Sequence, residues 1–218
     1  MKNIIHYALV LFIVAGLAGV GLNRVSEATK DRIAQSKKAA LADGQKIAFP
    51  GAEKFSDEKP FNVNGGKAVY YEAYDSSGKL IGYVLRYGVM GYQSEVEVLT
   101  GVTPDGNIKA IKVLSQAETP GLGAEVDTLP SSGTIWKKVG SLFSGEKEKK
   151  KSGPPPIPAF QAQYSNKTIS DLKVVKEKTD KYIEAISGAT ITSRAVTKAV
   201  RDPAEAFVKE VLKLEIRN

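Results

Sequence analysis

Cysteine is absent from this sequence of 218 residues, and His6 is its single histidine. Without cysteine the chain can form no disulfide framework, no thiolate-ligated iron–sulfur cluster and no Cys-based zinc site. His6 lies within an apolar run, so it supplies neither a cluster of histidine ligands nor the base of a Ser–His hydrolase triad. We therefore expect no metal site, and any redox function would need an organic cofactor.

Acidic residues are fewer than basic ones, which gives a formal net charge of +7. The lysines are not interleaved with aromatic residues along one face, so the pattern does not favour a nucleic-acid partner. Several instead lie in one run beside three prolines, within the stretch from Gly145 to Pro158. That composition is typical of a solvated surface insertion.

The N-terminus contains one long apolar run, from Ile4 to Leu22, without an acidic or basic side chain. About 20 such residues are enough for a helix to cross the hydrocarbon core of a membrane. A cleaved signal peptide is the alternative, with Gly16, Leu17 and Ala18 as its cleavage site. Signal peptides usually have apolar regions of only about 7–15 residues, so the length favours a retained anchor over residues 1–24.

Basic residues follow this run, and counting positive charges alone would place the rest of the chain in the cytoplasm. Long domains cross membranes largely regardless of charge, so both orientations stay open at this point. We expect residues 25–60 to form a helical stalk and a linker. Ser26 is a suitable N-cap for a helix that reaches Leu41, and the linker runs through Pro50 and Gly51.

Strand patterns then follow in quick succession. Residues 68–74 and 80–87 flank a turn at Gly78, and residues 95–102 and 108–114 flank another at Gly106. Two hairpins predict an antiparallel sheet of at least four strands. Shorter strands are expected within 169–175 and 182–186, followed by a helix over 193–201. Asp202 and Pro203 suit the start of a last helix, so the predicted class is α+β.

The sequence SGATITS, residues 187–193, lies between a predicted strand and a predicted helix. Gly188 and Ala189 allow a ligand to approach the backbone closely, and the amides at a helix N-terminus attract anions such as phosphate. The simpler alternative is an ordinary strand-to-helix turn in which Thr192 or Ser193 acts as the N-cap. The residue pattern by itself leaves both interpretations open.

SGATITS closely resembles the flavin-attachment motif of the FMN-binding domain family, which includes the RnfG and NqrC proteins. The resemblance implies covalent FMN on Thr190, linked as a phosphoester by a flavin transferase of the ApbE type. The neighbouring cofactor-binding residues would be Ser187, Gly188, Ala189, Thr192 and Ser193. Thr192 and Ser193 would donate hydrogen bonds to the phosphate. Glu184 stands where this family usually has aspartate.

A second stretch, ETPGLG at residues 118–123, resembles the loop of the same family that lies against the isoalloxazine ring. The resemblance implies that Glu118 and Thr119 bond polar edges of the ring and that Leu122 packs on its apolar part. Gly121 and Gly123 complete the predicted set of cofactor-binding residues. Gln116 occupies a position where many relatives have histidine.

Together these motifs imply that residues 61–218 form an FMN-binding domain on the extracytoplasmic side of the inner membrane. The implied function is electron transfer within a membrane-bound, ion-translocating ferredoxin:NAD oxidoreductase of the Rnf type. Its partners would be the other Rnf subunits, and no catalytic residue is expected in this chain alone. The alternatives are an NqrC-like component of a sodium-pumping quinone reductase, and a flavin-free, membrane-anchored module that binds an anion.

Overall fold

The computed structural model describes residues 2–64, 66–129 and 156–213. The chain divides into two compact units, Met1–Ala42 and Asp43–Asn218. Most of the predicted insertion at 145–158 lies outside the described residues. The division into an anchor (1–24), a stalk with linker (25–60) and a flavin domain (61–218) remains a prediction.

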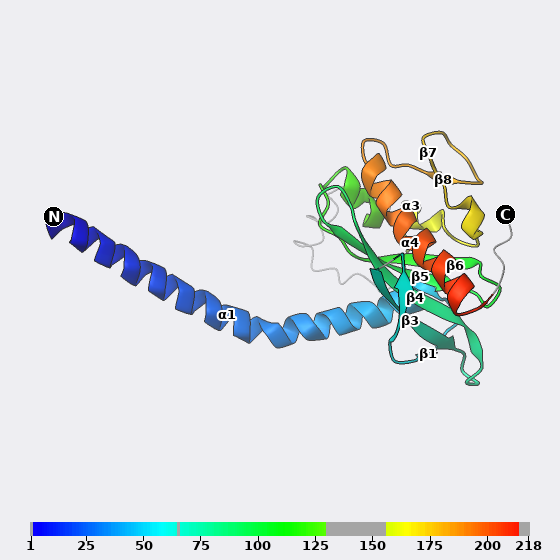
Figure 1. The fold of residues 1–218 in the computed structure, drawn as a ribbon, viewed down its shortest axis with the longest axis horizontal. Helices are drawn as coiled ribbons and strands as arrows, with labels where there is room; N and C mark the ends of the chain where they lie inside the picture. The colour runs from blue at the N-terminus through cyan, green and yellow to red at the C-terminus, as the bar shows by residue number, and fades with distance from the viewer. Residues whose placement is uncertain (1, 65, 130–155, 214–218) are drawn as a thin grey trace, which may run out of the picture. The chain divides into compact units, whose positions relative to one another are not determined.

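One uninterrupted helix, α1 (Lys2–Ala48), occupies the N-terminal part of the chain (Figure 1). The prediction of a separate helix capped by Ser26 is therefore wrong. No glycine or proline lies between Leu22 and Ser26 to end the first helix, so the backbone hydrogen bonds continue through this region. The apolar stretch of α1 has a mean hydropathy of 2.2 and is unburied. It is long and apolar enough to cross a membrane, which is consistent with a single-pass anchor.

The second unit is built on a six-stranded antiparallel sheet. Both predicted hairpins are confirmed: β3 (Gly66–Tyr74) pairs with β4 (Leu80–Met90), and β5 (Glu95–Val102) pairs with β6 (Ile108–Ser115). Two short strands, β1 (Lys54–Phe55) and β2 (Lys59–Val63), both pair with β3. Gly78 and Gly106 have φ of +80° and +83°, which explains why the two turns need glycine.

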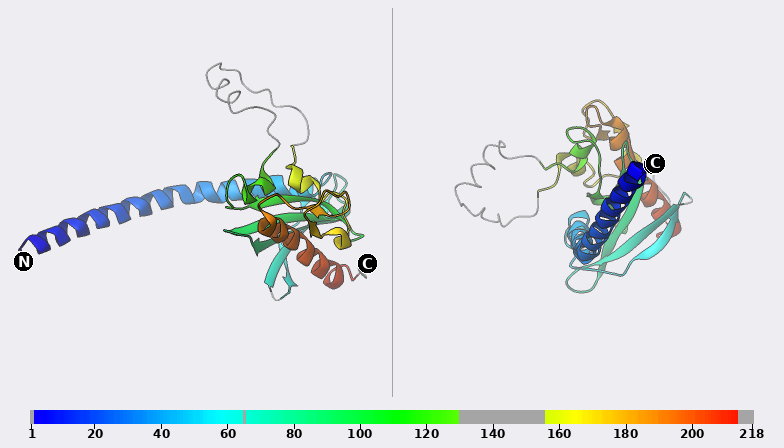
Figure 2. Two further views of the ribbon diagram at one scale, coloured as in Figure 1. Left: turned by 90° about the horizontal axis from the view of Figure 1, so that it is seen from above. Right: turned by 90° about the vertical axis from the view of Figure 1, so that its left-hand side faces the viewer.

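A long helix, α4 (Thr190–Glu210), lies along one face of this sheet (Figures 1 and 2). Its buried side packs on the strands and forms much of the core, with residues that include Val196, Val200 and Phe207. On the opposite face, Ala48 at the end of α1 and the following residue, Phe49, lie close to Gly82 and Gly101. A Cβ at Gly101 would lie 2.0 Å from the carbonyl oxygen of Ala48.

Helix α4 replaces the two helices that the sequence predicted. It begins at Thr190 instead of Ser193, and it continues through Pro203, so Asp202 is not an N-cap. A proline inside a helix costs about 3 kcal/mol because it lacks the amide hydrogen. Full burial of a side chain such as Phe207 gains about 1.5–3 kcal/mol, and the apolar stripe on both sides of Pro203 keeps the helix on the sheet.

Short elements connect the sheet to α4. They are the 3-10 turn η1 (Gly123–Asp127), α3 (Ala159–Ala162), the 3-10 turn η2 (Ile169–Asp171), and the strands β7 (Val174–Val175) and β8 (Ile183–Glu184). Strands β7 and β8 pair in parallel as a separate small sheet. The predicted strand over 169–175 is thus a turn in its first part. The predicted α+β class is confirmed.

Candidate functional site

The fold brings the two motifs into direct contact. The hydroxyl of Thr192, on the first turn of α4, donates a hydrogen bond of 2.6 Å to the Glu118 carboxylate, across 74 positions of sequence. The two loops are also closely packed, since a Cβ at Gly188 would lie 2.9 Å from the Leu122 Cδ2 atom. Residues 118–123 and 187–193 therefore form one site.

Glu118 is buried within this site, and its carboxylate joins several chain segments by hydrogen bonds. Its side chain is 5% exposed, and its carboxylate accepts hydrogen bonds from the backbone amides of Tyr92, Gln93 and Ser94 in addition to Thr192. Burial by itself raises the pKa of the carboxyl, but these donors, led by Thr192, outweigh it. The pKa of Glu118 is consequently held below its ordinary value of 4.5, so the group is a fully bonded carboxylate.

Two glycines allow other chain segments to approach this carboxylate. A Cβ at Gly91 would lie 2.7 Å from Oε1 of Glu118, and a Cβ at Gly123 would lie 2.7 Å from both Oε2 and the Thr192 hydroxyl. Position 121 favours glycine for a different reason: its φ is +74°, although nothing lies near the Cβ position. Gly188, with φ of +76°, combines both reasons.

The four hydroxyls of SGATITS lie in contrasting surroundings. Thr192 is buried and donates to Glu118, as described above. Ser193 is fully buried, donates to the Ala189 carbonyl at 2.9 Å and accepts from the Ile186 amide at 3.0 Å. Thr190 is partly exposed and Ser187 is exposed, and neither hydroxyl bonds to any residue in the described part of the chain. The hydroxyls of Thr192 and Ser193, expected to donate to a phosphate, are thus occupied by protein acceptors.

The N-terminus of α4 offers free backbone donors beside Thr190. The N-cap residue Ala189 makes no side-chain hydrogen bond, and the first in-helix amide bond runs from Ser193 to Ala189. The amides of Thr190, Ile191 and Thr192 therefore have no acceptor among the described residues. These amides and the helix dipole favour an anion at this position.

A cavity of about 260 Å³ lies where the two loops meet. Its walls come from both loops and one residue outside them, Tyr92; the lining residues are Tyr92, Glu118, Thr119, Leu122, Gly123, Gly188, Ala189, Ile191 and Thr192. Sequence reasoning missed Tyr92 and Ile191, whose large side chains are 70% and 55% exposed. Tyr92 lies in the turn between β4 and β5, and only the fold brings it to the site.

Comparison with known proteins identifies the family. The model of the FMN-binding domain matches residues 91–205, which is more than half of the chain. The G subunit of the proton-translocating ferredoxin:NAD(+) oxidoreductase complex of Clostridium ljungdahlii is 31% identical, over 89% of this chain and 86% of that protein. This chain belongs to the G-subunit family of ion-translocating oxidoreductase complexes.

A second relative supports this assignment, and a solved structure has a similar fold. The G subunit of the Na(+)-translocating ferredoxin:NAD(+) oxidoreductase complex of Acetobacterium woodii is 31% identical over 91% of this chain and 89% of that protein. Among solved structures, the C subunit of the Na(+)-translocating NADH-quinone reductase of Parabacteroides distasonis shares the fold. It has a TM-score of 0.54 and 18% identity, and the match covers 84% of this chain and 98% of that one.

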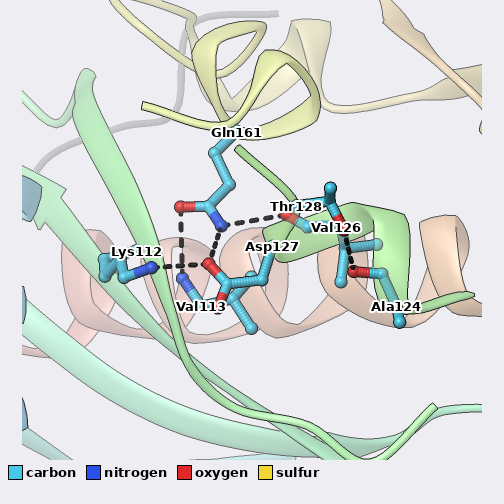
Figure 3. Close-up of polar contacts among 7 residues, drawn as sticks. All are labelled: Lys112, Val113, Ala124, Val126, Asp127, Thr128 and Gln161. Carbon is cyan, nitrogen blue, oxygen red and sulfur yellow. Dashed lines mark hydrogen bonds and ion pairs between the residues drawn. The ribbon is translucent and has the colours of Figure 1, made fainter. Parts of the chain in front are cut away.

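In this member of the G-subunit family the turn behind the ETPGLG loop is fixed by a partly buried polar network (Figure 3). The amide of Gln161 donates to the Val126 carbonyl at 2.9 Å and to the Asp127 carboxylate at 2.8 Å, and its oxygen accepts from the Val113 amide. Lys112 forms an ion pair of 2.5 Å with the same Asp127. The network joins η1, α3 and β6, and it holds η1 where its first residue, Gly123, reaches the site.

Proposed function

We propose that this protein carries FMN bound covalently through a phosphoester to Thr190, and that it transfers electrons within an Rnf-type ferredoxin:NAD oxidoreductase complex. One observation carries this proposal. Of the four hydroxyls in SGATITS, the Thr190 hydroxyl alone is both unbonded within the described residues and placed on the first residue of α4. A phosphate on this oxygen would lie beside the free amides of the helix N-terminus.

The residues around the cavity suit a flavin. Leu122, Ile191 and Tyr92 offer apolar and aromatic surface for a flat ring, and Thr119 presents a polar side chain at the wall. The cavity of about 260 Å³ is below the roughly 300–1,000 Å³ of typical ligand pockets, so part of the cofactor would stay outside it. When bound, FMN would supply the redox chemistry, and the protein would supply its attachment and position.

In this proposal Glu118 has a structural role, and it does not bond a polar edge of the ring as the sequence suggested. All four of its hydrogen bonds come from the protein, so its carboxylate ties the 118–123 loop to α4 instead of presenting a free acceptor to the ring. Thr192 and Ser193 likewise position the backbone around Thr190. Arg194, one helical turn after Thr190, would place a positive charge near the phosphoester.

The proposal includes partners and a location. A flavin transferase of the ApbE type would attach the FMN, and the other Rnf subunits would donate and accept the electrons. The flavin domain would lie on the extracytoplasmic side of the inner membrane, anchored by α1. The relatives from Clostridium ljungdahlii and Acetobacterium woodii are named as subunits of ion-translocating complexes, which supports the proposed partnership with other subunits.

The test is in-gel fluorescence of the full-length protein expressed in its own host. We expect a flavin band under ultraviolet light that survives denaturation, is lost in Thr190→Val and is retained in Ser187→Ala, which removes the other unbonded hydroxyl. Mass spectrometry of the peptide that contains residue 190 would show the added FMN. A dark wild-type band from cells with an active flavin transferase would refute the proposal and favour a flavin-free anion-binding module.

A further inference from the structure

A second concave surface lies on the side of α4 that is not covered by the sheet. It has a volume of about 340 Å³ and is formed by α4 and the segment that enters β7: Leu172, Lys173, Val174, Arg194, Thr197, Lys198 and Arg201. We call it the basic cleft. Nothing in the proposed flavin chemistry uses these residues apart from Arg194.

The basic cleft carries a concentrated positive charge. Arg194 and Lys198 are exposed on successive turns of α4, and Lys173 is exposed on the opposite wall. None of these three forms an ion pair with a residue that the structure describes. Arg201, at the far end, is neutralised by Asp202 at 3.1 Å and by Glu205 at 3.8 Å. Within the part of the chain that the structure describes, three cations without an ion-pair partner therefore line this short groove.

The remaining residues of the basic cleft make it a surface for contact and not for chemistry. The Thr197 hydroxyl is buried, lies 2.7 Å from the Tyr164 hydroxyl and donates to the Ser193 carbonyl, so it is unavailable to a ligand. Val174, which is partly exposed and lies next to the buried Leu172, gives the wall an apolar part. Such a combination accepts carboxylates along its charged side and apolar groups along the other.

The position of the basic cleft relates it to the flavin site. Thr190, Arg194 and Lys198 recur at intervals of four residues on α4, so their side chains follow one another along the same side of the helix. No cluster of metal-binding side chains occurs in the described residues, and the whole sequence has no cysteine. With no such cluster among the described residues, electrons that reach or leave a flavin on Thr190 would pass to another protein of the complex, and that protein would approach this residue.

We propose that the basic cleft is the docking site for an acidic segment of the partner protein that exchanges electrons with this chain. This inference rests on the proposed function, because the electron-transfer role explains why a partner must approach Thr190. Complementary charge would steer the partner's redox group toward the exposed edge of the flavin site and fix its orientation.

The test measures association of the full-length, flavin-loaded protein with the complex purified in detergent from a host strain that lacks this protein. Flavin fluorescence anisotropy follows binding at low salt and again at high salt. For Lys173→Glu combined with Lys198→Glu, we expect association to weaken about tenfold or more at low salt, since steering by charge changes association rates by roughly 10- to 1,000-fold. At about 0.5 M salt the difference should nearly vanish, because the Debye length is then only about 4 Å.

Lys209→Glu is a control for charge reversal outside the basic cleft, since it reverses one exposed lysine on the same helix. It should change association less than twofold. Equal binding by the wild type and the double variant, both carrying flavin on the gel, would overturn the docking proposal and leave the proposed function intact. A defect seen only with anionic lipid vesicles, and not in detergent, would assign the basic cleft to a lipid surface and also overturn it. Loss of the flavin band from the wild type would instead refute the proposed function.

Discussion

Thr190 and Thr192 lie two positions apart on the first turn of α4, yet their hydroxyls have opposite surroundings. Thr192 is 1% exposed and its hydroxyl is committed to Glu118, whereas the Thr190 hydroxyl is partly exposed and has no partner among the described residues. A hydroxyl that must react has to be accessible, and one that maintains a loop contact has to be buried and bonded. Under the proposed function, the same residue type would serve two purposes at this site.

This contrast predicts different costs for the same substitution. Thr192→Val removes a hydrogen bond to a buried carboxylate, and bonds to charged groups contribute about 1.5–3 kcal/mol. We expect the free energy of unfolding to fall by that amount in urea titrations of the flavin-free protein. Thr190→Val is the matched control and should change it by less than about 0.5 kcal/mol, as for other surface substitutions. Equal losses in both variants would contradict the assigned role of Thr192.

The same carboxylate makes stability depend on pH. Because the folded-state pKa of Glu118 lies below its ordinary value of 4.5, the folded form binds this proton less readily than the unfolded chain does. Its contribution is complete above the unfolded pKa and is lost as the pH falls through the folded pKa. Glu118→Gln should be less stable than the wild type near neutral pH, and the gap should narrow on acidification below about pH 4.

Urea denaturation of both proteins at a series of pH values would measure this gap. Glu125→Gln serves as a control, because Glu125 lies on the adjacent turn η1 and its carboxylate accepts no hydrogen bond from a described residue. This variant should change the free energy of unfolding by less than about 0.5 kcal/mol, as other surface substitutions do. If the stability difference between Glu118→Gln and the wild type did not change with pH, the loop contact would not depend on the charged carboxylate.

At the scale of elements, the ETPGLG loop depends on two glycines for separate reasons, which a matched pair of variants can distinguish. Gly121→Ala places a side chain on left-handed backbone and should cost about 1–2 kcal/mol of stability without entering the site. Gly123→Ala places a methyl group 2.7 Å from both the Glu118 carboxylate and the Thr192 hydroxyl. Overpacking of this kind costs about 1–3 kcal/mol and displaces the groups that it touches.

We therefore expect Gly123→Ala to lower the fraction of protein that carries flavin, and Gly121→Ala to leave that fraction close to the wild-type value. The ratio of flavin fluorescence to total protein on a denaturing gel gives the measurement. Full flavin loading of Gly123→Ala would contradict the view that the contact between the loop and α4 shapes the attachment site.

The elements also show which features the sequence could predict. The hairpins were predictable because the turns at Gly78 and Gly106 and the alternation of the strands are local signals. The continuity of α4 through Pro203 was not, because burial against the sheet decides it. In the site, SGATITS and ETPGLG were recognisable as motifs. Tyr92 and Ile191, and the internal bonding of Glu118, depend on packing between distant segments.

For the whole molecule, α1 predicts stable attachment to a membrane. Its stretch from Ile4 to Leu22 is apolar and exposed, and an arginine at the centre of such a helix costs about 2.5–3.5 kcal/mol on insertion scales. The wild-type protein should stay in the membrane fraction after an alkaline carbonate wash, whereas Leu11→Arg combined with Val14→Arg should be released or fail to insert. Arg24→Ala, beyond the apolar stretch, is the control that should remain attached.

The bond between Gln161 and Asp127 has a consequence for engineering the molecule. These residues stand on either side of positions 130–155 in the sequence, and the bond keeps the two ends of that stretch together independently of what connects them. The entropic cost of closing a loop grows slowly, by about 0.6 kcal/mol for each doubling of its length. The bond between Gln161 and Asp127 offsets part of this cost, so both residues should be kept when the domain is engineered.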